Sequence, residues 1–295
     1  MLHHSHSSPQ TPERVVVLGA GGFVGGALVA RLRAANVPVL PVARRDIDLT
    51  AADAASRLAT LLRQGDAVVA ASAKSPCKSS AMLAENMAMT HVILSALSQT
   101  PVAHVVNISS DAVYADLPEP LTEASVRAPN NFHGIMHVAR EVAFANEVKA
   151  PLAILRPSML YGVADPHSSY GPNMFRRLAN AGKPIVLFGE GEERRDHVSI
   201  DDVAEIIFRV LQHRSAGALN IVTGQVHSFR QVAEMVVALA DHQVEIKSTP
   251  RSGPMPHNGY RAFDNTATRQ SFPAFQYHSL FSIMERMQSD NHIVE

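Results

Sequence analysis

The amino-acid sequence predicts an α/β protein built on a doubly wound parallel sheet, with a smaller C-terminal lobe. Strand-like and helix-like patterns alternate through the first half of the chain, as a parallel sheet with helices on both faces requires. Three glycines directly follow the first strand, and a helical pattern starts among them. At 295 residues the chain is long enough for one large domain or two small ones, at about 150 residues per domain.

Short apolar, β-branched runs predict the strands, and longer amphipathic segments predict the helices. The predicted strands cover residues 14–18, 37–43, 67–72, 103–108 and 152–155. The predicted helices cover residues 22–35, 52–63, 81–98 and 133–147. Ligands of a parallel sheet bind outside the carboxyl ends of its strands, so residues that directly follow a strand are the first candidates for a site.

The first strand ends at a glycine turn formed by Gly19, Gly22 and Gly25, with Phe23 and Val24 inside it. Strand, glycine turn and helix in this order build a pocket for a pyrophosphate, because glycine permits the tight turn and the N–H groups of the helix start face the anion. A second strand follows about 20 residues later, as a βαβ unit requires. The sequence therefore predicts a Rossmann domain with a dinucleotide cofactor.

The segment after the second strand bears on the choice of cofactor. An acidic residue at this strand end holds the ribose 2′-hydroxyl of NAD, whereas an arginine pairs with the 2′-phosphate of NADP. Arg44 and Arg45 stand there and favour NADP, with NAD as the alternative. A solvated basic turn beside Asp46 and Asp48 is the other interpretation of the same residues.

Two serines and an aspartate, Ser109, Ser110 and Asp111, follow the strand at 103–108. Hydroxyl groups at a strand end are well placed to hydrogen-bond a carbonyl or alcohol that undergoes hydride chemistry. Serine and aspartate also form ordinary turns, so a purely local role is the alternative.

Charge and cysteine content exclude several classes of protein. The formal net charge of −1 predicts no nucleic acid and no membrane surface as a partner. A single cysteine, Cys77, cannot form an internal disulfide, which is consistent with a cytoplasmic protein. No apolar run approaches the roughly 18 residues of a membrane span. Residues 1–13 are predicted to be a disordered leader, and its histidines are not taken as a metal site.

Taken together, these motifs resemble the extended short-chain dehydrogenase/reductase family, which comprises nucleotide-sugar epimerases, dehydratases and ketoreductases. The resemblance extends over nearly the whole chain after residue 13. Beyond the glycine turn, it rests on Ser109–Tyr114, Leu155–Gly162 and Gly189–Val203. It implies further cofactor contacts from Asp48, Leu49, Ala71 and Pro157.

The resemblance also implies residues that bind the substrate. Arg195 is similar to the arginine that pairs with the substrate diphosphate in this family, and Asn173 is a second candidate for the same ligand. Arg261 belongs to a closing segment that lies over the nucleotide base. A surface arginine paired with Glu192, Glu193 or Asp196 is the alternative for Arg195.

The catalytic residues of the family are a serine or threonine, a tyrosine and a lysine, the last two in a Tyr-x-x-x-Lys helix. Ser110 stands at the hydroxyl position, but His133 replaces the tyrosine and His137 replaces the lysine. Three interpretations remain open. In the first, His133 is the proton shuttle, since an imidazole titrates near neutral pH, and His137 binds the ribose. In the second, another group transfers the proton, namely Asp111, Tyr114 or Tyr161. In the third, the chain binds a dinucleotide without catalysis. A metal site on the two histidines lacks an evident third ligand and is not predicted.

The sequence thus predicts an NAD(P)-dependent epimerase, dehydratase or 4-ketoreductase acting on a nucleotide-linked sugar, with a catalytically inactive dinucleotide-binding protein as the alternative. The Rossmann domain is expected over residues 14–160. A mainly substrate-binding lobe is expected over 161–295, with segments that return to the Rossmann core. A homodimer through the helices at 81–98 and 133–147 is also expected.

Overall fold

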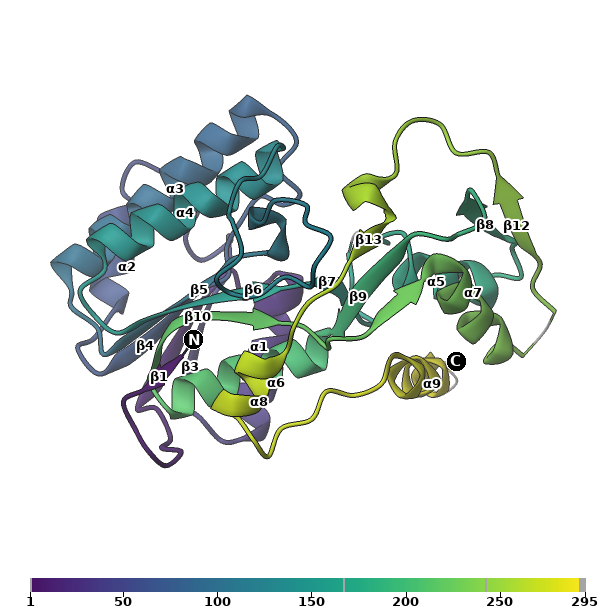
Figure 1. Ribbon diagram of the computed structural model, residues 1–295. Helices are drawn as coiled ribbons and strands as arrows, with labels where there is room; N and C mark the ends of the chain where they lie inside the picture. Colours follow the sequence, from purple (N-terminus) through teal and green to yellow (C-terminus); the bar gives the residue numbers. More distant parts are fainter. Residues whose placement is uncertain (1, 167, 242, 292–295) are drawn as a thin grey trace.

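The computed structural model describes residues 2–166, 168–241 and 243–291 (Figure 1). Its centre is a seven-stranded sheet of order β1-β10-β6-β5-β4-β2-β3, in which β1 alone runs antiparallel to its neighbour. The strands are β1 (His3–His4), β2 (Arg14–Leu18), β3 (Val39–Val42), β4 (Asp66–Ala70), β5 (His104–Ile108), β6 (Leu152–Pro157) and β10 (Ser215–Ile221). The doubly wound α/β fold predicted from the sequence is confirmed.

Helices cover both faces of this sheet. One face carries α2 (Ala54–Leu61), α3 (Ser80–Gln99) and α4 (Phe132–Glu147), and the other carries α1 (Phe23–Ala34), α6 (Ile200–Gln212) and α8 (Thr266–Ser271) (Figure 1). Alternate residues of β2 point to opposite faces of the sheet. Val15 and Val17 therefore pack in the core beneath α1 and α6, and Val16 and Leu18 pack in the core beneath α2 and α3.

All five strands and all four helices predicted in the first half are present, with ends that differ by up to a few residues. The prediction of a disordered leader was wrong for its first residues, because His3–His4 form β1 on the edge of β10. The His4 ring lies 4.5 Å from that of His213, its Nδ1 lies 2.7 Å from Ser215 Oγ, and Leu2 is buried. This segment is ordered by contacts with residues more than 200 positions away along the chain. Such contacts cannot be predicted from the local composition.

A smaller lobe lies beside the carboxyl end of the main sheet (Figure 1). One of its sheets contains β7 (Met159–Tyr161), β9 (Arg194–Ser199), β11 (Val226–Ser228) and β13 (Tyr260–Arg261), and another pairs β8 (Ile185–Phe188) with β12 (Ile246–Thr249). Its helices are α5 (Pro172–Asn180), α7 (Phe229–Ala238) and α9 (Leu280–Asn291). Phe175, Leu187 and Phe229 belong to a separate core in this lobe.

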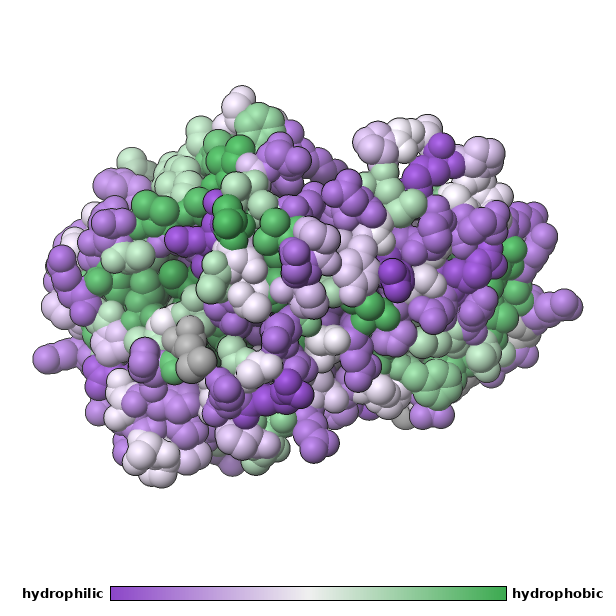
Figure 2. Space-filling model, viewed as in Figure 1, coloured by the Kyte–Doolittle hydropathy of each residue, from purple (hydrophilic) through white to green (hydrophobic). Residues whose placement is uncertain are grey.

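Apolar side chains on the surface gather over the Rossmann half in Figure 2. On α4, the exposed apolar residues are Phe132, Ile135 and Val142. Among the described residues, no helix has both the length and the apolar character needed to cross a membrane.

Candidate active site

The glycine turn has the backbone geometry that a bound anion requires. Gly19 has a φ of +87°, and a Cβ at this position would lie 2.7 Å from the backbone nitrogen of Ser72. A Cβ on Gly25 would lie 2.2 Å from the carbonyl oxygen of Gly19, so both positions require glycine. Gly22 begins α1 without a side-chain cap, which leaves the first N–H groups of the helix available to a ligand.

A first cavity of about 670 Å³ extends from this turn across the end of β3. Arg44, Asp48, Leu49 and Ala71 line it, as do Gly19 and Gly22. Arg44 Nε lies 3.1 Å from Asp48 Oδ2, and the arginine side chain is 78% exposed. Hydrogen bonds from Thr50 lower the pKa of Asp48 to about 2, so the carboxylate is ionised at neutral pH. The cavity therefore presents both a cation and a carboxylate at the predicted ribose position.

A second cavity of about 620 Å³, here called the catalytic cavity, begins on the other side of the turn. Ala71 and Ala73 line both cavities, so the two adjoin. The catalytic cavity brings together the predicted residues Gly22, Phe23, Val24, Gly25, Ser110, Asp111, His133, His137, Pro157, Arg195 and Arg261.

The two histidines of α4 lie together in this cavity, His137 buried and His133 half-buried. The ring centroids of His133 and His137 are 4.7 Å apart, with the rings edge to face. Burial lowers the pKa of His133, although Asp111 opposes this, and burial together with His133 and Arg140 lowers the pKa of His137 well below its usual value. Both imidazoles are therefore mainly neutral at pH 7. Nδ1 of His137 is buried and has no hydrogen-bond partner among the described residues.

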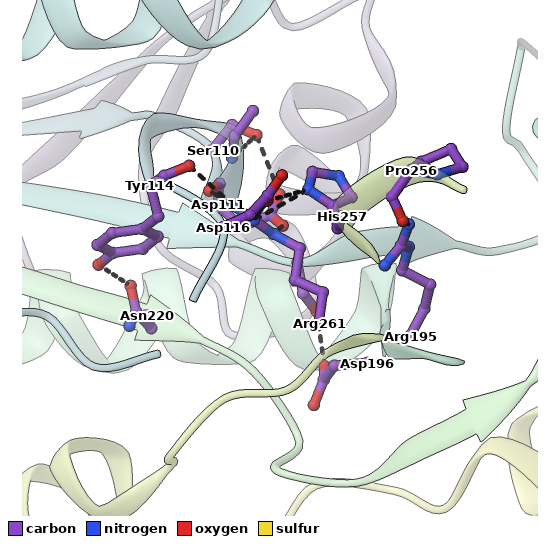
Figure 3. Close-up of polar contacts among 12 residues, drawn as sticks. Ser110, Asp111, Tyr114, Asp116, Arg195, Asp196, Asn220, Pro256, His257 and Arg261 are labelled. Carbon is purple, nitrogen blue, oxygen red and sulfur yellow. Dashed lines mark hydrogen bonds and ion pairs between the residues drawn. The ribbon is translucent and has the colours of Figure 1, made fainter. Parts of the chain in front are cut away.

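Ser110 and Asp111 lie between β5 and α4. The Ser110 hydroxyl accepts a hydrogen bond from the backbone N–H of Ala112 at 3.2 Å, so the serine forms a local turn and lines the cavity at once. Asp111 is held by Arg261, whose Nε lies 3.0 Å from Asp111 Oδ2 and whose Nη2 donates to the Asp111 carbonyl at 2.6 Å. Figure 3 shows these contacts.

Two buried arginines, Arg195 and Arg261, line the cavity. Arg195 is 4% exposed, pairs with Glu193 and donates to the carbonyl oxygen of Pro256 at 2.9 Å. The pairing with Glu193 is the alternative named from the sequence, but it occurs in the interior and not on the surface. Arg261 is 3% exposed and also donates to Asp116 Oδ1 at 2.8 Å (Figure 3).

Asn173 lies apart from both cavities, contrary to its expected contact with substrate. It is 1% exposed, accepts a hydrogen bond from the Gly162 N–H at 3.0 Å and donates to the Leu160 carbonyl at 3.4 Å. Its amide joins α5 to β7 and the turn after it, a role that depends on packing in the second lobe.

The two candidate phenols are also used by the fold. The Tyr114 hydroxyl donates to Asn220 Oδ1 at 2.6 Å and accepts from Arg156 at 2.7 Å (Figure 3 shows the Asn220 contact). Tyr161 is 1% exposed, and burial raises its pKa. Neither lines the catalytic cavity, whereas Asp111 and His133 do. Among the described residues, no cluster of three metal-ligating side chains exists.

Three residues at or beneath this site were not predicted from the sequence. His257 lines the catalytic cavity, and Asp116 contacts it. Arg140 lies fully buried on α4, donating to the Ser72 carbonyl at 2.7 Å and to Asn107 Oδ1 at 3.2 Å. The residues around His257 have the composition of a turn, which the sequence alone shows. The proximity of His257 to Asp116 depends on tertiary structure.

Comparisons with known proteins show relatives that match this chain over most of its length. The chain is 27% identical over 258 residues to the GDP-6-deoxy-D-mannose reductase of Pseudomonas aeruginosa, covering 81% of this chain and 84% of that protein. It is 27% identical over 291 residues to the dTDP-6-deoxy-L-talose 4-dehydrogenase (NAD(P)(+)) of Kitasatospora kifunensis, covering 90% and 92%. A solved GDP-L-fucose synthetase from Naegleria fowleri, bound to NADP, has the same fold, with a TM-score of 0.81 over 99% of this chain and 98% of that one at 16% identity.

A family model described as "NAD dependent epimerase/dehydratase family" matches residues 15–222, which span the glycine turn, Ser110 and the histidine pair. The chain therefore belongs to the NAD-dependent epimerase/dehydratase family.

Proposed function

We propose that this enzyme reduces a 4-keto sugar linked to a nucleoside diphosphate, using NADPH or NADH. The observation that carries the proposal is the catalytic cavity, which joins the glycine turn to Ser110 and His133. The two relatives described above are named as a reductase and a 4-dehydrogenase of nucleotide-linked 6-deoxyhexoses, and both are matched over most of their length. The chain is an oxidoreductase of the family, and the 4-keto substrate is our choice among its reactions.

The residues of the site fit a dinucleotide. The uncapped start of α1 binds the pyrophosphate, and Arg44 pairs with a 2′-phosphate, which favours NADP over NAD. The buried Nδ1 of His137, in the wall of the catalytic cavity, and the buried hydroxyl of Ser72, in the wall of the first cavity, have no partner among the described residues, so polar groups of a bound dinucleotide would satisfy them. When bound, the reduced nicotinamide supplies the hydride.

The protein contributes the proton and the orientation of the substrate. Ser110 donates a hydrogen bond to the ketone oxygen, and protonated His133 transfers a proton to that oxygen as the carbon is reduced. Asp111 stabilises the imidazolium, since its charge opposes the effect of burial on the pKa of His133. Because the acid form is the active one, the rate of reduction should rise as pH falls towards a pKa below 6.5. Oxidation, which needs the neutral imidazole, should show the opposite dependence.

The second lobe supplies the substrate contacts. Arg195 lines the catalytic cavity and pairs with Glu193, so the substrate diphosphate competes with this carboxylate for the guanidinium. We also propose a homodimer in the cytoplasm, formed through α3 and α4, because the exposed apolar residues Phe132, Ile135 and Val142 lie on α4.

The test is turnover of GDP- and dTDP-linked 4-keto-6-deoxyhexoses with NADPH and NADH, followed by mass-resolved chromatography. A product two hydrogens heavier identifies a reductase, and a new isomer or a loss of water identifies an epimerase or a dehydratase. His133→Phe should lower turnover at least about 100-fold, the contribution of a general acid, whereas His3→Phe, at an exposed position of β1 away from both cavities, should not. Cofactor binding without turnover on any sugar would instead identify a catalytically inactive dinucleotide-binding protein.

A further inference from the structure

A third cavity, of about 550 Å³, lies against the glycine turn and outside the site described above. The start of α1, the turn after β7, the start of α6 and helix α9 enclose it. It shares Gly22, Phe23 and Pro166 with the catalytic cavity, and Ala20, Gly21 and Gly22 with the first cavity. Apart from the glycine turn, no residue assigned above to the cofactor or the substrate lines it. We call it the outer cavity.

The wall of the outer cavity is mainly apolar, and small residues on α1 keep it open. Gly26, Ala27 and Ala30 lie along one side of this helix, where longer side chains would fill the space. Larger apolar side chains complete the wall, namely Phe23, Val163, Ile200, Ile283 and Met287. Small-molecule sites are typically clefts of roughly 300–1,000 Å³ with such a lining, whereas one water fills about 30 Å³. The outer cavity therefore has the size and the lining of a ligand site.

One buried polar group in this wall, the Tyr161 hydroxyl, has no hydrogen-bond partner among the described residues. Tyr161 is 1% exposed, and its ring packs in the core of the second lobe. The hydroxyls of Tyr114, Tyr170 and Tyr277, by contrast, each form at least one hydrogen bond within the protein. Leaving a buried hydroxyl without a partner costs free energy, which a bound hydrogen-bonding group would recover. Tyr161 is thus the point at which a ligand would be anchored.

The charges near Tyr161 determine which ligand fits. Asp201 and Arg286 form an ion pair, are both about half exposed and line the outer cavity. Burial raises the pKa of Tyr161, Asp202 and Asp201 raise it further, and Arg286 opposes them. The phenol is therefore protonated at neutral pH and lies in a net negative field, which disfavours an anionic ligand. Asp201 and Asp202 are already paired, with Arg286 and His278, so neither carboxylate is left for a cationic ligand.

We propose that the outer cavity binds a small neutral molecule that is largely apolar and carries one hydroxyl or carbonyl group. The polar group of this molecule forms a hydrogen bond with the Tyr161 hydroxyl, and its apolar part packs along Gly26 and Ala27 of α1 and against Ile283 of α9. The ligand lies against the same glycine turn as the dinucleotide but in a separate cavity, so both are bound at once. This inference does not depend on the reaction proposed above.

The experiment measures the binding of three matched probes to the full chain by isothermal titration calorimetry. The probes are 2-naphthol, which is neutral with a hydroxyl group, naphthalene, which lacks that group, and 2-naphthoate, which is an anion. Saturating NADP⁺ keeps the first cavity occupied. Tyr161→Phe removes only the hydroxyl, and Ala27→Leu fills the outer cavity, the only one of the three that Ala27 lines. Tyr170→Phe, in the same lobe but outside all three cavities, is the matched control.

We expect the wild type and Tyr170→Phe to bind 2-naphthol equally well, and 2-naphthoate at least about tenfold more weakly. Tyr161→Phe should weaken 2-naphthol binding by about fivefold, the contribution of one hydrogen bond, and leave naphthalene binding unchanged. Ala27→Leu should abolish the binding of both. No binding of 2-naphthol to the wild type would overturn the inference. Full binding to folded Tyr161→Phe and Ala27→Leu proteins, or binding of 2-naphthoate as tight as that of 2-naphthol, would overturn it as well.

Thermal unfolding without a probe checks the observation on which the inference rests. Tyr161→Phe should not lower the melting temperature, because the hydroxyl that it removes has no partner among the described residues. Tyr277→Phe is the comparison and should lower it, because the Tyr277 hydroxyl accepts a hydrogen bond from the Val222 N–H at 3.2 Å. Equal losses in the two variants would show that the Tyr161 hydroxyl is already satisfied and would overturn the inference. None of these results changes the proposed function, which turnover of a sugar substrate tests separately.

Discussion

Replacing Glu141 with glutamine should destabilise the protein severely, because this carboxylate is the charge partner of a buried arginine. Glu141 accepts two hydrogen bonds from Arg156, at 2.8 and 2.7 Å, one from Ser109 at 2.6 Å and one from Arg127 at 2.9 Å. The Glu141 side chain is fully buried and that of Arg156 is 3% exposed. Removing one partner of a buried ion pair costs about 3–5 kcal/mol, since the other charge stays buried without compensation.

The expected change in melting temperature follows from the chain length. An unfolding entropy of about 2.1 cal/mol/K per residue gives roughly 0.6 kcal/mol/K for 295 residues. A loss of 3–5 kcal/mol then lowers the midpoint by roughly 5–8 °C. Calorimetry or thermal circular dichroism measures this. Glu190→Gln is the control, because its carboxylate is 74% exposed and its pair with Arg230 contributes at most about 1 kcal/mol.

The pH dependence provides an independent check of the same argument. Burial alone would raise the pKa of Glu141, but Arg156, Ser109 and Arg127 together lower it below its usual value. The stabilisation is therefore fully present above the unfolded-state pKa, near 4.5, and disappears as pH falls through the lower folded-state pKa. The difference between wild type and Glu141→Gln should stay constant from pH 6 to 8 and shrink below about pH 4.5. A midpoint shift below about 2 °C, or one independent of pH in acid, would refute this reasoning.

Three further changes test other parts of the site. Gly25→Ala should weaken NADPH binding at least about tenfold, as measured by fluorescence titration. Gly26→Ala is the control and should not weaken it, because the added Cβ would lie 3.6 Å from the nearest atom. Equal losses of affinity in both variants would contradict the steric argument. Arg44→Ala should weaken NADPH binding by about 1.5 kcal/mol, roughly tenfold, and leave NADH binding unchanged; a loss shared by both cofactors would exclude pairing with the 2′-phosphate. Arg140→Met should raise the pKa of His137, followed by NMR titration, because Arg140 is a cation that lowers it; an unmoved titration would contradict that role.

The glycine turn and the order of strands were predictable because they depend on local chemistry. A run of valines, a positive-φ glycine and the start of a helix lie within a dozen residues, and their pattern alone indicates a pyrophosphate pocket. The position of Ser110 and of the two histidines followed from the order of motifs along the chain. In the structure, all three line the same cavity.

Tertiary partners were not predictable from the sequence. His257 meets Asp116 across 141 positions of the chain, and no local signal links them. Arg261 was predicted as a substrate contact. Its guanidinium forms ion pairs with Asp111 and Asp116, and these partners are evident only in the folded structure. Asn173 lies outside both cavities for a related reason, because a polar residue near a site can equally satisfy the buried backbone.

The short strand β1 has a consequence for how this protein avoids pairing of sheet edges between chains. Strand β10 lies on the outer side of the main sheet, where an open edge would invite another chain to add a strand. His3–His4 pair with Ser215 and Ala216 at one end of β10. At the other end, the Asn220 N–H donates to Glu123 at 2.8 Å, and its carbonyl accepts from Thr268 at 3.3 Å. An incoming strand would find both ends of this edge already hydrogen-bonded, so a few residues outside the Rossmann core protect the sheet from edge-to-edge aggregation.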